Sequence, residues 1–160
     1  MNLGDIKKEF PKLFSNPRFY GFECGDGWNQ LIHAGCKSIQ NHIDWTLKQI
    51  ENTKEWNRRV EDPEEDWDRV IVPRELREVP KEVPQVSIIQ IKEKFGELRF
   101  YYSGGDEYIR GIVDLMYSIS RYTCEVCGAP GHLSLNRGWY KTLCADHANE
   151  LNFKKVDEYG

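Results

Sequence analysis

Four residues near the carboxyl end have the types and the spacing of metal ligands. Cys124 and Cys127 are separated by two residues, and Cys144 and His147 form a second short-spaced pair further along the chain. Structural zinc takes four sulfur and nitrogen ligands in a tetrahedron, and two such pairs supply them. Sulfur-rich ligation with no spare position favours a structural ion over a catalytic one. The sequence therefore predicts a structural Zn²⁺ site at these four residues.

The segments around the ligands predict the elements that position them. Residues 132–135 and 139–143 can pair as strands across the turn 136–138, and residues 145–155 have a helical pattern. The second ligand pair then lies on the first turn of that helix. A cysteine knuckle, a hairpin and a helix that begins with ligands together predict a treble-clef zinc finger.

The other cysteines and one further histidine give weaker signals. Cys36 lies on the apolar stripe of a predicted helix and is expected in the core. Cys24 has acidic neighbours, which disfavour a reactive thiolate. His132 stands between the two ligand pairs without a partner of its own, so a histidine of the hairpin is the favoured interpretation over a metal ligand.

Two glycine-rich turns precede long predicted helices and form a second group of candidate site residues. Free N–H groups at such a turn can bind an anion, for example a nucleotide phosphate. Each turn also carries an aspartate that can cap the same N–H groups, and capping is the favoured interpretation. Neither turn matches a Walker or dinucleotide fingerprint. The residues are Gly25, Asp26 and Gly27 in the first turn, with Ser103, Gly104, Gly105 and Asp106 in the second, where Ser103 and Asp106 have the spacing of a capping box.

The remaining pattern predicts an α+β fold. Apolar residues recur at three- and four-residue spacing over residues 26–50, which predicts a long amphipathic helix that Asp26 would cap. Residues 85–91 and 98–102 predict an antiparallel β-hairpin, and a second long helix follows over residues 106–119. We expect the two long helices to pack on the hairpin, with the treble-clef-like zinc finger at the carboxyl end.

The chain is expected to divide into a core, residues 1–120, and a zinc-finger module, residues 121–160, packed on it. The module is expected to pack against the second long helix through the aromatic side chains of Tyr117, Trp139 and Tyr140. Residues 51–84 form a charged insert that holds four of the seven prolines. Within it, residues 60–68 predict a solvated loop and residues 68–72 a short strand.

Composition restricts the class of protein. Apolar residues make up 39% of the 160 residues, enough for a core, and the formal net charge of −4 disfavours non-specific nucleic-acid binding while leaving room for a local basic face. The first residues lack the apolar run of a secretory signal, and no apolar stretch is long enough to span a membrane. Five cysteines, an odd number, fit a metal site in a reducing compartment, so a cytoplasmic location is expected.

Several segments together resemble a group of small, largely uncharacterised proteins of phages and bacterial genomes that end in a CxxC…CxxH zinc finger. The likeness covers about residues 18 to 150, and the segments that carry it are residues 21–28, 91–106, 124–131 and 138–144, with His147. The resemblance implies a phage or prophage accessory protein in the bacterial cytoplasm. Small accessory proteins of this kind often inhibit host machinery or host immunity, by binding a protein or by sequestering a signal molecule.

These observations favour a non-enzymatic, zinc-stabilised binding protein that blocks or redirects a host factor, with a host protein as partner. A second hypothesis is that the two glycine-rich turns sequester or hydrolyse a nucleotide or signal molecule. A third is nucleic-acid binding through the finger. Residues 121–155 hold five basic and three acidic residues, a small excess for a DNA-reading finger.

Overall fold

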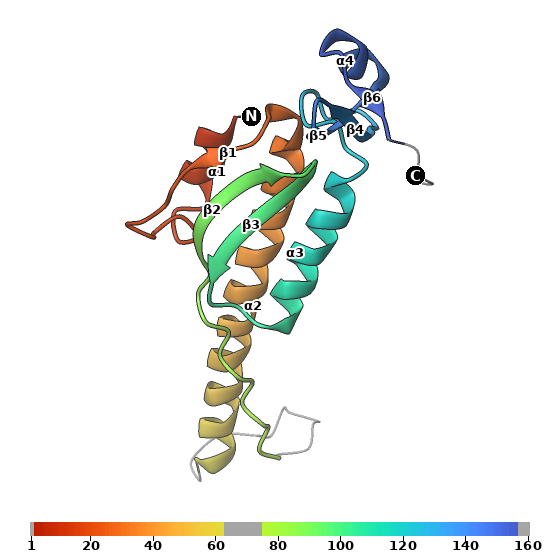
Figure 1. Cartoon of the computed structure of the whole chain (residues 1–160). Helices are drawn as coiled ribbons and strands as arrows, with labels where there is room; N and C mark the ends of the chain where they lie inside the picture. The colour runs from red at the N-terminus through yellow and green to blue at the C-terminus, as the bar shows by residue number, and fades with distance from the viewer. Residues whose placement is uncertain (1, 63–74, 157–160) are drawn as a thin grey trace.

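Helices and two small sheets make up the fold of this chain, and the computed structural model describes residues 2–62 and 75–156. Over these residues the prediction of a mixed α+β fold is confirmed (Figure 1). In chain order the elements are α1 (Leu3–Glu9), β1 (Phe22–Glu23), the 3-10 helix η1 (Asp26–Trp28), α2 (Asn29–Glu61), β2 (Ser87–Lys94), β3 (Glu97–Ser103), α3 (Glu107–Ser120), β4 (His132–Asn136), β5 (Trp139–Leu143), α4 (Ala145–Glu150) and β6 (Lys154–Lys155).

Helix α2 is the longest element, with 33 residues. The apolar residues buried on its inner stripe are Ile32, Cys36, Ile39 and Ile43, three or four positions apart, and Ile50, two turns further on. The helix continues beyond the apolar stripe to Glu61, so the first part of the predicted charged insert is helical. The strand predicted at residues 68–72 lies outside the described residues, as does most of the loop predicted at residues 60–68.

A three-stranded sheet in the order β1-β2-β3 lies against the two long helices. Strands β2 and β3 are antiparallel, as the sequence predicts, and β1 joins β2 in the parallel direction with Phe22 opposite Ile91. The β2–β3 turn consists of Phe95 and Gly96, both with positive φ, of 56° and 80°. Two central residues with positive φ characterise a type I′ turn, whose twist matches that of the flanking strands.

Helices α2 and α3 run antiparallel and cover one face of this sheet (Figure 1). Gly35 of α2 faces Met116 of α3, and a Cβ at Gly35 would lie only 2.2 Å from the Met116 sulfur, so glycine permits this close approach. Helix α3 is also bonded to β3, because the Tyr117 hydroxyl donates to the carbonyl oxygen of Phe100 at 3.1 Å and accepts from its N–H at 3.0 Å. The core is thus a two-layer α/β sandwich.

The last turns of α2 project beyond the sheet (Figure 1). A returning segment lies along this projecting part. Trp56 Nε1 donates to the Glu75 carbonyl at 2.9 Å, and Asn57 exchanges two hydrogen bonds of 2.8 Å with the backbone of Arg77. The Arg77 guanidinium also stacks over the Trp56 ring at 4.0 Å. Polar and stacking contacts therefore hold this projecting arm together, and the arm buries few apolar side chains.

The carboxyl-terminal module contains a second sheet, in the order β5-β4-β6, beside α4. The helix predicted over residues 145–155 is wrong in its second half. Asn152 has φ 58° and its N–H bonds to the Asn149 carbonyl, while the Phe153 N–H bonds to the Ala148 carbonyl. These two bonds form a Schellman motif, which ends a helix. The released chain then pairs with β4 as β6.

Candidate metal centre

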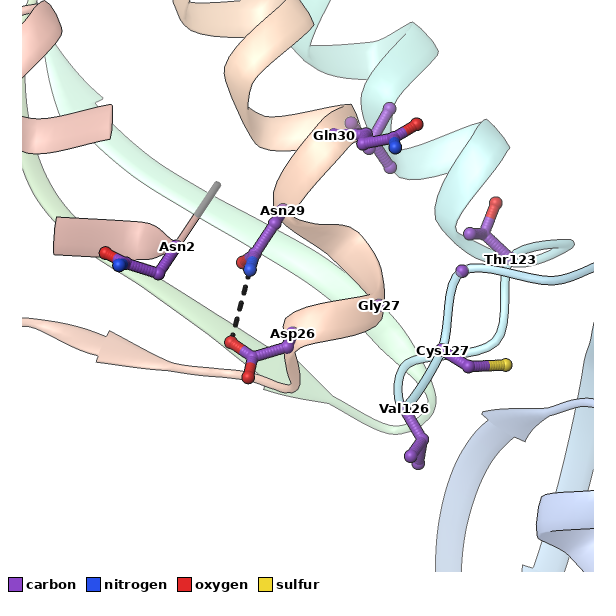
Figure 2. A pocket seen from close by; sticks show the side chains of 10 residues that line it. Asn2, Asp26, Gly27, Asn29, Gln30, Thr123, Val126 and Cys127 are labelled. Carbon is purple, nitrogen blue, oxygen red and sulfur yellow. Dashed lines mark hydrogen bonds between the residues drawn. The ribbon is translucent and has the colours of Figure 1, made fainter. Parts of the chain in front are cut away.

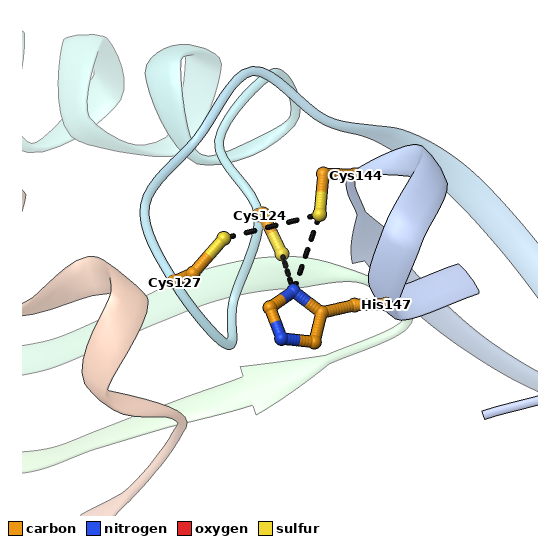
Figure 3. Close-up of side chains that lie close together, drawn as sticks. All are labelled: Cys124, Cys127, Cys144 and His147. Carbon is orange, nitrogen blue, oxygen red and sulfur yellow. Dashed lines mark hydrogen bonds between the residues drawn. The ribbon is translucent and has the colours of Figure 1, made fainter. Parts of the chain in front are cut away.

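The four predicted ligands converge on one point, between the knuckle and the start of α4 (Figure 3). Cys124 Sγ lies 3.6 Å from His147 Nδ1, and Cys127 Sγ lies 3.8 Å from Cys144 Sγ. Cys144 Sγ and His147 Nδ1 are 3.2 Å apart. One ligand atom from each residue lies within 4.8 Å of the other three. Sulfur and imidazole nitrogen in this arrangement are a group that can hold a metal ion.

The knuckle that presents Cys124 and Cys127 is held by its own backbone. The Gly128 N–H bonds to the Cys124 carbonyl at 2.9 Å, and the Cys124 N–H bonds to the Ala129 carbonyl at 2.8 Å. Gly128 has φ 79°, a left-handed conformation that glycine adopts without strain. This local fold brings both sulfurs to the same side of the loop.

Backbone N–H groups of the site also favour the thiolate that binds metal. Burial alone raises the pKa of the Cys124 thiol, but hydrogen bonds from the N–H groups of Cys144, Cys127 and Val126 outweigh burial and lower that pKa to about 7. Hydrogen bonds to the charged form of a group stabilise that form. Since the thiolate is the ligating species, these N–H groups prepare Cys124 for a cation, whereas the pKa of the Cys127 thiol is raised.

The second ligand pair is positioned where β5 passes into α4. Cys144 is the N-cap residue of α4, with extended backbone at φ −72° and ψ 169°, and its carbonyl accepts the Ala148 N–H at 2.9 Å. His147 follows on the first turn of the helix, as predicted. Both side chains therefore project from the same end of α4 toward the knuckle (Figure 3).

Glu125, which stands between the two knuckle cysteines, joins the metal centre to the core. The residue is only 4% exposed, and its two carboxylate oxygens accept from the Gly25 N–H at 3.0 Å and the Lys141 ammonium at 2.7 Å. Its carbonyl accepts the Gly27 N–H at 2.8 Å, and its N–H donates to the Thr142 carbonyl at 2.9 Å. Sequence reasoning missed this residue, because no local pattern shows that a glutamate in a cysteine knuckle is buried.

Two more contacts fix the module on the core. Trp28 is fully buried, and its Nε1 donates to the Thr123 carbonyl at 2.8 Å, directly before the first ligand. The Thr142 hydroxyl donates to the Gly96 carbonyl in the β2–β3 turn at 2.6 Å. The ligand-bearing loops are therefore bonded to two separate elements of the core.

The predicted aromatic contact between module and core is wrong. Trp139 is 75% exposed and Tyr140 is 37% exposed, and Tyr117 bonds to the backbone of Phe100. The close backbone approach of the knuckle to η1 replaces that contact. A strand pattern states which residues share a face, and not what covers that face.

The first glycine-rich turn precedes α2 and the second lies beside the middle of that helix, where Asp106 bonds to His42 at 2.9 Å, so the two turns do not form a shared anion site. At the first turn, a Cβ on Gly25 would lie 2.3 Å from the Glu125 carbonyl oxygen, and a Cβ on Gly27 would lie 2.2 Å from that of Cys124. The glycines here permit close contact with the metal-binding knuckle. The predicted cap is wrong, since Asp26 accepts from the Asn29 side-chain amide at 3.2 Å and Gly25 is the N-cap of η1.

At the second turn, a Cβ on Gly104 would lie 2.3 Å from the Gln85 carbonyl oxygen, and the Gly105 N–H donates to the Pro84 carbonyl at 2.9 Å. Asp106 is itself the N-cap of α3 and accepts the Ile109 N–H at 3.0 Å. Ser103 ends β3, so the predicted capping box is absent from this helix start. The N–H groups of Gly105 and Ile109 are thus already hydrogen-bonded within the protein.

A polar cleft of about 570 Å³ lies beside the metal centre, between α1, η1 and the knuckle (Figure 2). Asp26 and Asn29 line one wall and Thr123, Val126 and Cys127 the other. Figure 2 shows that the Asp26–Asn29 hydrogen bond crosses one wall of this cleft. The cleft places solvent next to one ligand, Cys127, whereas the Cys124 side is buried.

The remaining sequence candidates lie away from the ligands. Burial raises the pKa of both the Cys24 and the Cys36 thiol to about 12, with the charge of Glu125 adding to the effect at Cys24. A thiol with so high a pKa is a poor nucleophile. His33 and His42 point to different partners, Glu9 at 3.0 Å and Asp106 at 2.9 Å, as expected for residues on different faces of a helix.

Comparison with known proteins gives no relative from which function could be transferred: no family model, curated protein or solved structure matches the chain. Over residues 2–62 and 75–156, no helix combines the length and the apolar character that a bilayer crossing requires.

Proposed function

We propose that the four-ligand centre holds a structural Zn²⁺ ion in a treble-clef-like finger. A tetrahedral zinc with bonds of about 2.3 Å to sulfur and about 2.05 Å to nitrogen separates its ligand atoms by about 3.8 Å for two sulfurs and about 3.6 Å for sulfur and nitrogen. The observed separation of 3.2 Å between Cys144 and His147 is shorter than this geometry requires, whereas those of 3.8 Å between Cys127 and Cys144 and 3.6 Å between Cys124 and His147 match it and support the assignment. This match is the observation that carries the proposal.

The chemistry of the ligands supports a structural ion rather than a catalytic one. Three thiolates and one imidazole fill all four positions of a tetrahedron, whereas catalytic zinc keeps one position open for water or substrate. A disulfide is an unsuitable alternative, because a bonded sulfur pair lies about 2.05 Å apart and the Cys127–Cys144 sulfurs lie 3.8 Å apart. Within the described part of the chain, these residues are the single group with metal-ligand geometry.

The chain as a whole then acts as a non-enzymatic binding protein whose zinc keeps a recognition surface in place. The module has a small core of its own around Leu143 and Ala148, so metal ligation contributes directly to its folding. The resemblance to phage and bacterial proteins supplies the biological context of this proposal: the bound factor would be a component of the bacterial host.

Metal analysis of the natively purified protein tests the proposal. We expect one zinc per chain by inductively coupled plasma mass spectrometry, with Cys144→Ser losing the metal and Cys36→Ser retaining it. Cys36 is the matched control, because it is a buried cysteine outside the ligand group. A protein that folds fully with no bound metal would refute the structural zinc.

Affinity purification from bacterial lysate on the same zinc-loaded sample tests the binding function. The expected result is a host factor retained by the wild type and lost with Cys144→Ser. Turnover of a substrate by the zinc-loaded protein, abolished by a ligand mutation, would contradict the non-enzymatic assignment.

A further inference from the structure

Two hairpin tips from distant parts of the chain lie side by side at the outer edge of the zinc-finger module. The β2–β3 tip contributes Phe95 and the β4–β5 tip contributes Trp139 and Tyr140, and together they line a hollow of about 320 Å³. A second hollow, of about 360 Å³, adjoins it at the β4–β5 turn, where Arg137 lines the second hollow and the next residue, Gly138, lines the first. We call this surface the tip surface.

Exposed aromatic rings dominate the tip surface. Phe95 is 65% exposed, Trp139 75% and Tyr140 37%. Burial of side chains of this size contributes strongly to the free energy of folding, and these three exposed side chains lack much of that contribution. Their exposure supports a partner that covers them.

Both tips carry an unexpected residue at the first central turn position. Phe95 has φ 56° before Gly96, and Arg137 has φ 47° before Gly138 with φ 86°. Turns with positive φ at both central residues strongly prefer asparagine or aspartate followed by glycine. Phenylalanine and arginine are both strained there, and neither side chain is needed by the turn itself. Strain of this kind concentrates at functional positions.

Positive charge lies on one side of the rings. Lys94 lines the hollow that holds the rings, and Arg137, Lys154 and Lys155 line the adjoining hollow. None of these four makes an ion pair within residues 2–62 and 75–156, whereas other cations of this region are neutralised. The one acidic residue that lines the hollow, Glu93, accepts the Gly96 N–H at 2.6 Å.

In the structure, some basic residues of the finger are paired with acidic residues and others are not. Arg121 pairs with Glu97 at 2.7 Å and Lys141 pairs with the buried Glu125 at 2.7 Å. Two of the five basic residues of the finger are therefore neutralised. The small basic excess counted along the sequence becomes a local cationic surface beside the aromatic rings.

We propose that the tip surface binds single-stranded nucleic acid. Aromatic rings stack on unpaired bases without regard to sequence, and cations along the path neutralise the phosphates. Duplex DNA hides its base faces, so it would contact the cations alone. An acidic protein would also satisfy the charges, but lysines are depleted at protein interfaces and three of the four cations here are lysines. The inference names the partner class of the binding function proposed above and rests on it.

Fluorescence anisotropy of a labelled oligothymidylate of about twenty nucleotides tests the inference. At about 50 mM salt we expect a dissociation constant in the micromolar range. With four neutralised phosphates, the logarithm of the binding constant should fall with the logarithm of salt concentration with a slope of about −2.8, since each phosphate contributes about −0.7 on a single strand.

Matched variants separate binding from folding. Trp139→Ala should weaken binding by about 5- to 150-fold, the range for loss of one stacked base, whereas Trp45→Ala, which removes an exposed tryptophan of α2, should not. Phe95→Asn and Arg137→Asn should both weaken binding without lowering Tm, because asparagine suits both turns. Arg137→Asn should also reduce the salt slope by about 0.7, and Arg18→Asn, in the loop between α1 and β1, should leave it unchanged.

The outcomes are distinct. Zinc-loaded protein that shows no anisotropy change up to about 100 μM, the weak limit of non-specific binding, overturns the inference and leaves the zinc-stabilised binding function standing. A duplex bound more tightly than the single strand also overturns it. Displacement of the oligonucleotide by polyglutamate at equal charge, with Trp139→Ala unaffected, would indicate an acidic protein instead. A metal-free folded protein contradicts the proposed function itself.

Discussion

Replacing Gly27 by alanine tests the idea that close backbone contact with the core holds the metal-binding knuckle in place. A Cβ at this position would lie 2.2 Å from the Cys124 carbonyl oxygen, 2.6 Å from that of Glu125 and 2.6 Å from the Gly128 nitrogen. All three atoms belong to backbone, so no side chain can rotate away. The knuckle or η1 must therefore move by about 1 Å to reach an ordinary contact distance.

That displacement breaks defined hydrogen bonds. The Gly27 N–H to the Glu125 carbonyl, now 2.8 Å, contributes about 1 kcal/mol, and the Gly25 N–H to the Glu125 carboxylate, now 3.0 Å, contributes about 2 kcal/mol because one partner is charged. We therefore expect Gly27→Ala to lower the free energy of unfolding by about 3 kcal/mol. Zinc affinity should fall as well, since two ligands flank the displaced carbonyls.

Urea unfolding followed by far-ultraviolet circular dichroism measures the change, with a zinc competition assay on the same samples. Gly111→Ala is the matched control, because Gly111 lies within α3 and its Cβ would meet no atom within 4 Å. That substitution should raise the free energy of unfolding by about 0.5 to 1 kcal/mol. If the two variants are equally stable and bind zinc equally well, the knuckle is not held by this contact and the reasoning is refuted.

Three further predictions follow from the same geometry. Removal of metal by a chelator should unfold the β4–β5 module while α2 and α3 keep their structure, which nuclear magnetic resonance spectra will show as loss of dispersion for residues 124–156 alone. Burial raises the pKa of the Cys24 and Cys36 thiols to about 12, so at pH 8 only about one thiolate in 10⁴ is present, and iodoacetamide should label neither cysteine until urea is added, as judged by mass spectrometry. Desolvation raises the pKa of Asp106, but hydrogen bonds from His42 and the Ile109 N–H outweigh desolvation and lower that pKa. The Asp106 carboxylate therefore stabilises the folded protein near neutral pH, and this stabilisation is lost as the pH falls through the lowered pKa. Asp106→Asn should therefore be less stable than the wild type at pH 7 and equally stable near pH 2, with zinc content unchanged at pH 7.

The periodic elements could be predicted from the sequence because their signals are local. The apolar stripe of α2, the β-branched run of β2 and the cysteine spacing each depend on a few neighbouring residues. The ligand group was predictable for the same reason: only metal ligation readily explains two short-spaced pairs of these residue types.

The contacts between elements were not predictable, because they depend on which surfaces meet. The parallel pairing of β1 joins Phe22 to Ile91, far apart in sequence, and no local pattern encodes that register. From the sequence alone Glu125 is expected to be a solvated charge. Its partners, the Gly25 N–H and the Lys141 ammonium, are brought to it only by the fold. The continuation of α2 to Glu61 was missed because its last turns have no apolar stripe, although charged residues with good helix propensity sustain them.

The length of α2 has a consequence for the local opening of the folded protein. At about 1.5 Å per residue the helix is about 50 Å long, with one end beside the metal centre and the other in the projecting arm. Its two halves share one hydrogen-bond ladder but have unequal tertiary support. Amide exchange should therefore form a gradient along a single continuous helix, slow near Ile32 and fast near Asn57. A tag, dye or fused domain attached at the arm would report on the protein while leaving the end that carries the four-ligand group undisturbed.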